Sequence, residues 1–395
     1  MDDAIPELLD HGPGFSEAPL PLFDAPPPQE ELFARLRLAR SRRVGPATFR
    51  RLIAAHGDAV AALTALPGLA AAAGDTSYAP ATEAEIRREI RAAKAAGARL
   101  LTLGAPGYPH RLAQVGDAPP VLWCQGDPKL LTRRSVAVVG TRNASSLALR
   151  MARALGRALS EAGVTVVSGL ARGVDTAAHT AALDGGTVAV HAGGLDRVYP
   201  AENAELGTAI AATGCALSER PFGLHPTARD FPRRNRIVSG VAQAVVVVEA
   251  AARSGSMITA RDALDQGREV MAVPGHPFDT RASGCNLLLR DGATLVRGAE
   301  DVLDLLDGLM RDAPPRPAPE PVAEATAPAP TDGDATVLRA RILSLLSPVP
   351  VGEDQLRRDL APGGEADARA VAAQLSELEL AGEIARRPGG SLVRL

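Results

Sequence analysis

The sequence predicts an α/β protein whose central domain has a mostly parallel sheet with helices on both faces, between a small helical domain and a second small domain. Two observations predict the central domain. Between residues 106 and 310, short apolar runs alternate with segments of helical Ala/Leu spacing, which is typical of parallel βαβ units. The runs are nearly continuous in apolar residues, as expected of strands buried on both faces. At 395 residues, the chain has room for two or three domains.

The chain begins with residues 1–30, which are rich in proline and acidic residues and are predicted to be a disordered leader. A small helical domain follows over 31–105. Within it, Gly45 and Pro46 form a turn that opens an amphipathic helix. The SAM or helix-hairpin-helix type of module presents backbone N–H groups of such a turn to phosphate. A loop that joins two helices of a bundle explains the turn equally well.

Five apolar runs define the expected strands of the central domain, and a further strand is expected to end near Ser218. The runs are 135–139, 164–167, 187–190, 244–248 and 269–273. Right-handed crossovers would place the loops that follow these strands along one edge of the sheet. Ligands bind at that edge in open α/β sheets, so we expect the functional residues there.

The region after the sheet divides into a linker and a winged-helix domain. Residues 311–334 are rich in proline, alanine and acidic residues and have little capacity to bury apolar surface. Residues 335–395 have the order helix, helix, helix and hairpin that is typical of a winged helix. The expected helices are 337–346, 353–360 and 367–381, with the hairpin at 384–393. Because the third helix is acidic, a protein-docking or structural role is a better interpretation than reading of duplex DNA.

Composition excludes several classes of protein. The net charge is −3 at pH 7, so nucleic acid would have to bind at a local patch and not by coating a basic surface. No run of about 18 apolar residues appears, and residues 1–6 lack the features of a signal peptide. The three cysteines form no CxxC pair, which argues against a zinc site and a disulfide scaffold. We therefore expect a cytoplasmic protein without a metal or other cofactor.

The most concentrated positive charge lies at 231–238, Phe-Pro-Arg-Arg-Asn-Arg-Ile-Val. Like charges packed together cost free energy unless an anion compensates them. Arginine also suits bidentate contacts with phosphate. We interpret this segment as a basic loop at the edge of the sheet that holds a polyanion.

The first two loops after the strands are expected to face phosphate. Gly140 starts a turn that opens a helix and exposes backbone donors to an anion. This turn departs from the GxGxxG pattern because Arg142 stands where the second glycine would be, so NAD is not expected. The second loop, 168–175, contains two glycines and an arginine. Asp175 and His179 lie four residues apart on the following helix. They could form an acid/base pair, although a local helix-stabilising hydrogen bond is the commoner explanation.

The third and fourth loops differ in polarity. The third, 193–200, turns tightly but is short of basic groups, and we interpret it as structural. The fourth, 249–259, leads into a helix through Ser254, Gly255 and Ser256. These residues offer hydrogen bonds to phosphate, ordinary helix capping, or both. No Ser/His/Asp order and no P-loop lysine emerges, so donors are plentiful and no catalytic residue is predicted.

Four motifs stand in order at these positions: VVGTR at 138–142, SGLARGVD at 168–175, FPRRNR at 231–236 and RSGSMITA at 253–260. They resemble the motifs of the bacterial DNA-processing protein A family (DprA, also called Smf). The resemblance implies a Rossmann-like domain that binds single-stranded DNA, protects it, and helps to load the RecA recombinase during natural transformation. It also implies a homodimer formed through that domain, and no catalysis is known for the family.

The resemblance assigns a DNA-binding site residue by residue. Arg142 and Arg172 match the pocket cations of the family, and residues 233–236 match its basic loop. Phe231, beside that loop, offers a base a stacking face worth about 1–3 kcal/mol. The expected DNA-binding residues are Gly140, Arg142, Ser168, Gly169, Arg172, Gly173, Phe231, Arg233, Arg234, Asn235, Arg236, Ser254, Gly255 and Ser256.

Two alternatives stay open from the sequence. Related Rossmann-like proteins of the LOG type are phosphoribohydrolases that cleave nucleoside monophosphates, and Glu249 with the turn at 254–256 resembles part of their site. The Gly-Gly-x-Gly-Thr run of that family is absent, however, and Asp262 stands where a glutamate would be expected. The other alternative is a nucleotide-sensing adaptor, which would bind mononucleotides tightly and ignore long single strands.

Overall fold

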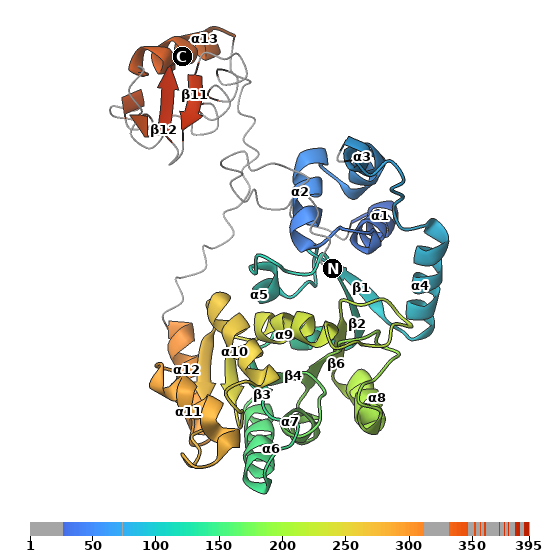
Figure 1. Ribbon diagram of the computed structural model, residues 1–395, viewed down its shortest axis with the longest axis vertical. Helices are drawn as coiled ribbons and strands as arrows, with labels where there is room; N and C mark the ends of the chain where they lie inside the picture. The colour runs from blue at the N-terminus through green and yellow to red at the C-terminus, as the bar shows by residue number, and fades with distance from the viewer. Residues whose placement is uncertain are drawn as a thin grey trace. The chain divides into compact units, whose positions relative to one another are not determined.

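The structure is a computed structural model, which describes residues 27–72, 74–311 and 332–346, together with separate positions between 351 and 394. The chain forms two compact units (Figure 1). One comprises residues 19–314, and the other contains the C-terminal region from residue 315. Most of the predicted leader and most of the predicted linker lie outside the described residues.

Four helices form the first part of the larger unit, almost entirely within the range 31–105 that the sequence predicts to be a helical domain. They are α1 (Gln29–Arg40), α2 (Pro46–His56), α3 (Ala59–Ala72) and α4 (Glu83–Ala95). The end of that range is not helical, because residues 99–102 form the first strand of the sheet. Gly45 precedes α2 in an extended conformation and Pro46 occupies its first turn, where a missing N–H costs nothing. Among the described residues, no single helix is long and apolar enough to cross a membrane. Helices α2 and α3 reach the required length and apolarity only when they are taken together, and the two helices are bent by 106° relative to each other.

Several arginines of this helical region pair with neighbouring carboxylates. Arg35 is fully buried and its Nε lies 2.6 Å from Glu31. Arg42 and Arg43 both pair with Asp75, at 2.8 and 3.4 Å. These ion pairs compensate part of the positive charge of the helical region.

The sheet of the larger unit has nine strands in the order β1-β2-β6-β5-β4-β3-β7-β8-β9. Strands β3 to β9 pair in parallel, whereas β1 pairs with β2, and β2 with β6, in antiparallel fashion. The sheet therefore confirms the predicted mostly parallel fold. The strands are β1 (Arg99–Thr102), β2 (Val121–Gly126), β3 (Ser135–Val139), β4 (Thr165–Ser168), β5 (Thr187–Val190), β6 (Cys215–Ser218), β7 (Ala244–Val247), β8 (Glu269–Ala272) and β9 (Thr294–Leu295).

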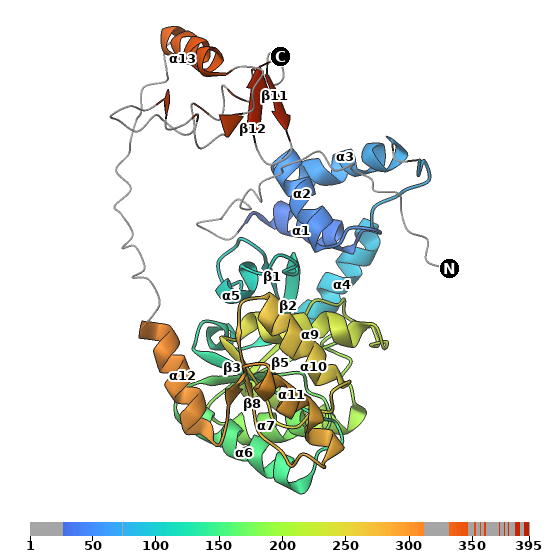
Figure 2. The ribbon, with the colours of Figure 1, turned by 60° about the vertical axis from the view of Figure 1, so that its left-hand side comes forward.

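Helices cover both faces of the sheet because side chains alternate along each strand. Val136 and Val138 point into a core with α6, α7 and α12. Ala137 and Val139 point into the opposite core with α5, α9, α10 and α11, which Figure 2 shows across the sheet from α6 and α7. The helices are α5 (His110–Ala113), α6 (Ser146–Glu161), α7 (Val174–Ala182), α8 (Ala204–Thr213), α9 (Asp230–Val241), α10 (Gly255–Asp265), α11 (Ser283–Arg290) and α12 (Ala299–Arg311).

Strand β3 is the point at which the order of the sheet reverses. The chain runs from β3 outward through β4, β5 and β6 on one side, and then returns to β7 on the other side of β3. Loops that follow β3 and β7 therefore leave toward opposite faces of the sheet. A crevice opens between them at the carboxyl ends of the strands, which is where such sheets bind ligands.

The arginine-rich segment 231–238 was expected to be a loop, and this expectation is wrong. It forms most of helix α9. The helix is stabilised at its start by Asp230, whose Oδ2 accepts hydrogen bonds from the backbone N–H and the hydroxyl of Thr227. Because successive residues of an α-helix are turned by about 100°, consecutive arginines cannot all point to the same side. Helix geometry thus separates the charges that are adjacent in the sequence.

The C-terminal unit contains a helix and a small sheet. Helix α13 (Asp332–Leu345) covers most of the first predicted helix, and the predicted hairpin is present as β11 (Ile384–Arg387) and β12 (Ser391–Arg394). Strand β10 (Val351–Gly352) pairs with β12 on its other side. Most of the second and third predicted helices lies outside the described residues. Apolar residues from all of these segments share one core.

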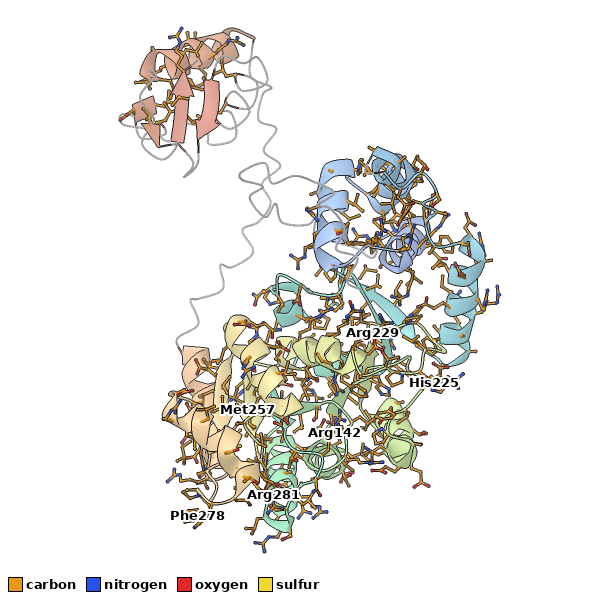
Figure 3. All side chains as sticks on the ribbon, in the orientation of Figure 1. Arg142, His225, Arg229, Met257, Phe278 and Arg281 are labelled. Carbon is orange, nitrogen blue, oxygen red and sulfur yellow. The ribbon has the colours of Figure 1, made fainter. Side chains whose placement is uncertain are left out.

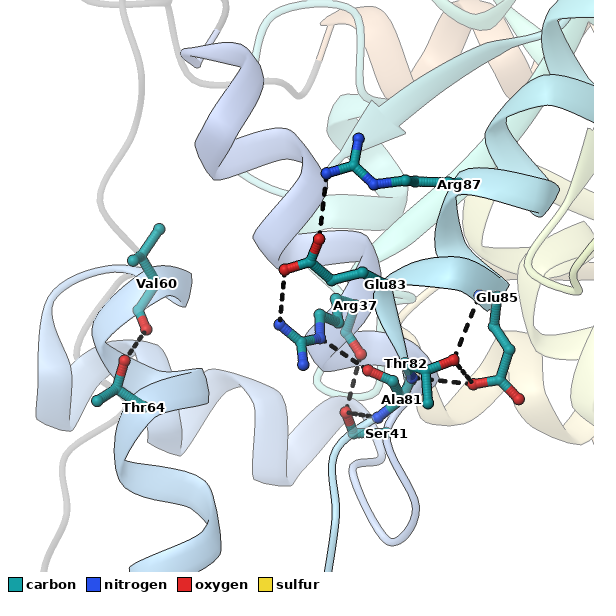
Figure 4. Close-up of polar contacts among 9 residues, drawn as sticks. All are labelled: Arg37, Ser41, Val60, Thr64, Ala81, Thr82, Glu83, Glu85 and Arg87. Carbon is teal, nitrogen blue, oxygen red and sulfur yellow. Dashed lines mark hydrogen bonds and ion pairs between the residues drawn. The ribbon is translucent and has the colours of Figure 1, made fainter.

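A buried carboxylate joins α4 to the sheet. Glu89 is 8% exposed and accepts hydrogen bonds from Arg40 Nη2 at 2.8 Å and from the indole Nε1 of Trp123 at 2.6 Å. The opposite face of α4 is exposed, and Figure 4 shows Glu83 between Arg37 and Arg87 near the capping box of Thr82 and Glu85. Glu89 and Glu83 therefore differ in the number of their buried partners.

We predict that Glu89→Ala lowers the free energy of unfolding by about 3 kcal/mol, because it leaves the mostly buried guanidinium of Arg40 and a buried indole N–H without a partner. Glu83→Ala removes only exposed ion pairs and should cost less than about 1 kcal/mol. Urea denaturation of the two variants measures the difference. Equal losses would show that the buried carboxylate does not hold the helical region to the sheet.

Candidate nucleic-acid interface

A hollow of about 730 Å³ lies at the carboxyl edge of the sheet, in the crevice beside β3. It is lined by the loops that follow β3 and β4, by helix α9, and by the start of helix α10. Nine of the predicted DNA-binding residues line it: Gly140, Arg142, Gly169, Phe231, Arg234, Asn235, Ser254, Gly255 and Ser256. The fold therefore brings together residues that are more than 110 positions apart in the sequence.

The first turns of helices α10 and α7 lie at this hollow. Helix α10 starts at Gly255, and Ser254 occupies its N-cap position without a side-chain capping bond. The Ser254 hydroxyl is buried and has no hydrogen-bond partner among the described residues. Helix α7 starts after Gly173, whose φ of 77° suits glycine and whose added Cβ would lie 2.4 Å from the carbonyl oxygen of Thr141. The first turn of α10 provides backbone N–H groups and the positive end of a helix dipole, which favour an anion. In α7, by contrast, the N–H groups of Val174 and Thr176 already donate to the carbonyl oxygens of Thr141 and Ala171.

Arg234 forms the floor of the hollow. Its guanidinium is buried, and Nη1 donates hydrogen bonds to the carbonyl oxygens of Gly169 and Val190. A Cβ on Gly169 would lie 2.4 Å from this guanidinium, so only glycine allows the approach. Burial lowers the pKa of Arg234 to about 10, and the side chain therefore remains a cation near neutral pH. It contributes positive charge to the site and holds the second loop.

Asp175 shapes the same loop from the other side. Its Oδ2 accepts hydrogen bonds from the backbone N–H groups of Gly169 at 3.1 Å and Ala171 at 3.3 Å. Burial raises the pKa of this carboxyl group. His179 instead bonds through Nδ1 to the hydroxyl of Thr187 at 2.7 Å. Both interpretations of Asp175 and His179 as a mutual pair are therefore wrong, because each has a different partner.

An aromatic pair stands at the mouth of the hollow. The Arg142 guanidinium lies 5.0 Å from the centre of the Phe231 ring, and the Tyr199 ring lies 5.3 Å from Phe231 on centroids. Figure 3 labels Arg142 near the middle of this domain. Tyr199 belongs to the third loop, 193–200, which was expected to have only a structural role. This loop contains a single arginine, Arg197, which lies beside Asp196, and the exposed ring of Tyr199 is the signal that could have assigned the loop to the site.

The remaining predicted residues lie outside the main hollow. Arg172 pairs with Glu202 at 2.7 Å and lines a small adjoining hollow. Arg233 is exposed on α9, and Arg236 pairs with Glu219 at 2.7 Å and with Asp117 at 3.4 Å. The hydroxyl of Ser168 donates to the carbonyl of Val138 beneath the hollow, and Gly173 supports the turn before α7. The expectation that 233–236 acts as one basic loop is therefore corrected, because the helix turns Arg234 inward and Arg236 toward carboxylates.

Glu249, which the phosphoribohydrolase alternative requires, does not line this hollow. Its Oε2 accepts the backbone N–H of Ser145 at 2.9 Å. It faces a separate hollow of about 1000 Å³ beside α6 and the start of α12. The carboxylate and the turn at 254–256 therefore belong to different hollows. Within the part of the chain that the structure describes, no cluster of three or more His, Cys, Asp or Glu residues could hold a metal ion.

Two histidines lie buried beneath the site. Burial lowers the pKa of His179 to about 3 and that of His191 to about 4, from the ordinary value of 6.5. The folded chain therefore takes up these protons only below pH 4, whereas the unfolded chain takes them up below pH 6.5. Stability is fully present above pH 6.5 and is lost as the pH falls through this window.

We predict that lowering the pH from 7.5 to 5 reduces the free energy of unfolding by about 2 kcal/mol for each of these histidines. His191→Gln should remove about half of this loss, because glutamine does not titrate. Urea denaturation at both pH values measures it. An unchanged pH dependence in the variant would contradict the assignment of a neutral, buried His191.

Comparison with known proteins places these features in a family. A family model described as DNA recombination-mediator protein A matches residues 99–307. Models described as a DprA-like N-terminal HHH domain and a DprA winged helix domain match 29–92 and 313–390. The winged-helix expectation for the tail and the helix-hairpin-helix expectation for the N-terminal region are therefore confirmed at the level of the family.

Individual relatives agree with these models. Protein Smf of Escherichia coli strain K12 is 40% identical over 286 residues, which cover 72% of this chain and 74% of that protein. DNA processing protein DprA of Bacillus subtilis is 39% identical over 225 residues, 56% of this chain and 76% of that protein. The X-ray structure of DprA from Streptococcus pneumoniae superposes with a TM-score of 0.59 at 31% identity, covering 71% of this chain and 98% of that one. The chain belongs to the DNA recombination-mediator protein A (DprA) family.

Proposed function

We propose that this chain is a single-stranded DNA-binding protein that protects incoming DNA and loads the RecA recombinase during natural transformation. The observation that carries the proposal is the hollow beside β3, where the N-terminus of helix α10, the exposed Arg142 and the buried Arg234 surround one space. Backbone N–H groups and guanidinium groups are donors that bind phosphate irrespective of base sequence.

Local electrostatics explains how a chain with net charge −3 can bind a polyanion. The donors are gathered at one hollow, while many arginines elsewhere are paired with carboxylates, such as Arg42 with Asp75 and Arg236 with Glu219. Binding therefore depends on a few phosphates at a defined position. A strand in this hollow also meets the rings of Phe231 and Tyr199, and only an unpaired base can stack on them.

The family supports the finer parts of the proposal. Its description as a recombination mediator fits delivery of the bound strand to a recombinase. The cytoplasm is the compartment that such a partner implies, and three free, buried cysteines fit a reducing environment. We propose no catalytic step, because the groups that a phosphoribohydrolase would need face different hollows.

The proposed activity is tested by fluorescence anisotropy with labelled oligo-dT and the matching duplex at two salt concentrations. The wild-type protein should bind oligo-dT more tightly than the duplex. With about four phosphates contacted per protomer, log K should fall against log salt with a slope near −3, at about −0.7 per contact. Equal affinity for the two forms, or affinity independent of salt, would contradict the proposal.

A matched pair of variants locates the binding site in the same experiment. Arg142→Glu should weaken binding of oligo-dT by at least about 10-fold, because it replaces a cation at the hollow by an anion. Arg153→Glu makes the same charge change on the exposed face of α6, outside the hollow, and should have little effect. Equal effects of both variants would indicate a response to net charge and not to this hollow.

We also propose that the chain forms a homodimer through the Rossmann-like domain. Strand β9 ends the sheet, and Leu295 on this strand is 44% exposed. A sheet edge with an exposed apolar residue is a surface that a second copy can cover.

We predict that Leu295→Arg shifts the protein from dimer to monomer in sedimentation analysis, because it places a charge in the proposed interface. Leu264→Arg is a suitable control, since Leu264 is 57% exposed on α10, away from the sheet edge. A dimer that persists in Leu295→Arg would rule out β9 as the interface.

A further inference from the structure

The ring of Tyr199 is the most accessible aromatic surface at the proposed DNA site. Tyr199 is 52% exposed, whereas its neighbour Phe231 is only partly exposed. The two rings lie 5.3 Å apart on centroids and are tilted by 59°. The guanidinium of Arg142 lies 5.0 Å from the centre of the Phe231 ring. Phe231 is therefore already in contact with a cation and a second ring, and Tyr199 is the member of the pair with free surface.

Tyr199 lies where two hollows join. It lines both the hollow of about 730 Å³ and a smaller one of about 40 Å³, together with Phe231 and Arg142. Arg172 lines only the smaller hollow. A strand whose phosphate sits in the main hollow would thus pass the Tyr199 ring before it reaches Arg172.

The backbone around Tyr199 is held in place by buried hydrogen bonds. Asn203 is 4% exposed, and its Nδ2 donates to the carbonyl of Leu170 and to the hydroxyl of Thr176, both at 2.9 Å. Its backbone N–H donates to the carbonyl of Pro200 at 3.0 Å. These bonds fix the third loop to the second loop, so the ring is presented without a large loss of conformational entropy on binding.

We propose that Tyr199 is the residue on which an unpaired base of the bound strand stacks, with its ring supported by Phe231, which is in turn contacted by Arg142. The inference rests on the proposed function and adds to it the group that distinguishes a single strand from a duplex. A base within a duplex has both faces covered by its neighbours, so only an unstacked base can use this ring. Because every base has a flat face, the contact is tolerant of sequence.

The test compares oligo-dT with an abasic oligonucleotide of the same length, which keeps the phosphates and lacks the bases. Tyr199→Ala should weaken binding of oligo-dT by about 5- to 100-fold and leave binding of the abasic strand unchanged. Tyr199→Phe keeps the ring and should bind both strands as the wild type does. Phe278→Ala removes an aromatic that is 92% exposed and lines neither hollow, and it should change nothing. Figure 3 shows Phe278 well away from Arg142.

The outcomes separate this inference from the proposed function. If the wild-type protein does not bind oligo-dT, the proposed function fails. If the wild-type protein binds oligo-dT and Tyr199→Ala weakens both strands equally, the ring only supports the loop and the inference is overturned. Unchanged binding of oligo-dT by Tyr199→Ala overturns it as well. Thermal unfolding of Tyr199→Ala, with a midpoint close to that of the wild type, confirms that the comparison is made between folded proteins.

Discussion

Parallel pairing of β3 with β4 on one side and with β7 on the other is the constraint on which the proposed site depends. Parallel strands end at a common edge, and the reversal of order at β3 sends the following segments to opposite faces. The crevice that results receives the first turns of α7 and α10 and one side of α9. Backbone N–H groups are thereby directed at one space. The absence of a Cβ at Gly169 and Gly173 lets the second loop pack closely against Arg234 and the first loop without steric conflict.

Two buried charges keep the site in shape. Arg234 donates to the carbonyl groups of Gly169 and Val190, and Asp175 accepts from the amides of Gly169 and Ala171. Removing such groups from water is costly, and the hydrogen bonds they make with the loop offset that cost. Both groups act on the same short segment from opposite sides. The second loop therefore has its conformation fixed before a ligand binds, which reduces the conformational entropy lost on binding.

The distribution of charge matters more than its total. In the helical region, arginines such as Arg40 and Arg42 are bound to carboxylates, and their contribution is to hold helices together. At the crevice, Arg142 is exposed and contacts an aromatic ring. A phosphate can approach the guanidinium of Arg142 without displacing a carboxylate. Net charge and local density of arginine thus describe different properties, and only the structure distinguishes them.

The sequence by itself determined the six inner strands of the sheet, their parallel pairing, and three of the loops that form the crevice, but not the outer strands β1, β2 and β9. Continuous apolar runs separated by helical spacing are local signals, and parallel topology leaves one edge for the loops. The sequence did not determine that 231–238 is a helix, because a run of arginines lacks the apolar periodicity that predicts a helix. The tertiary structure decided that Arg234 points inward, that Arg236 turns to Glu219, and that Tyr199 joins the site. The directions of Arg234 and Arg236 depend on how α9 is rotated about its axis against the sheet. The position of Tyr199 depends on how the third loop packs against the second. Both are set by contacts between parts of the chain that are distant in the sequence.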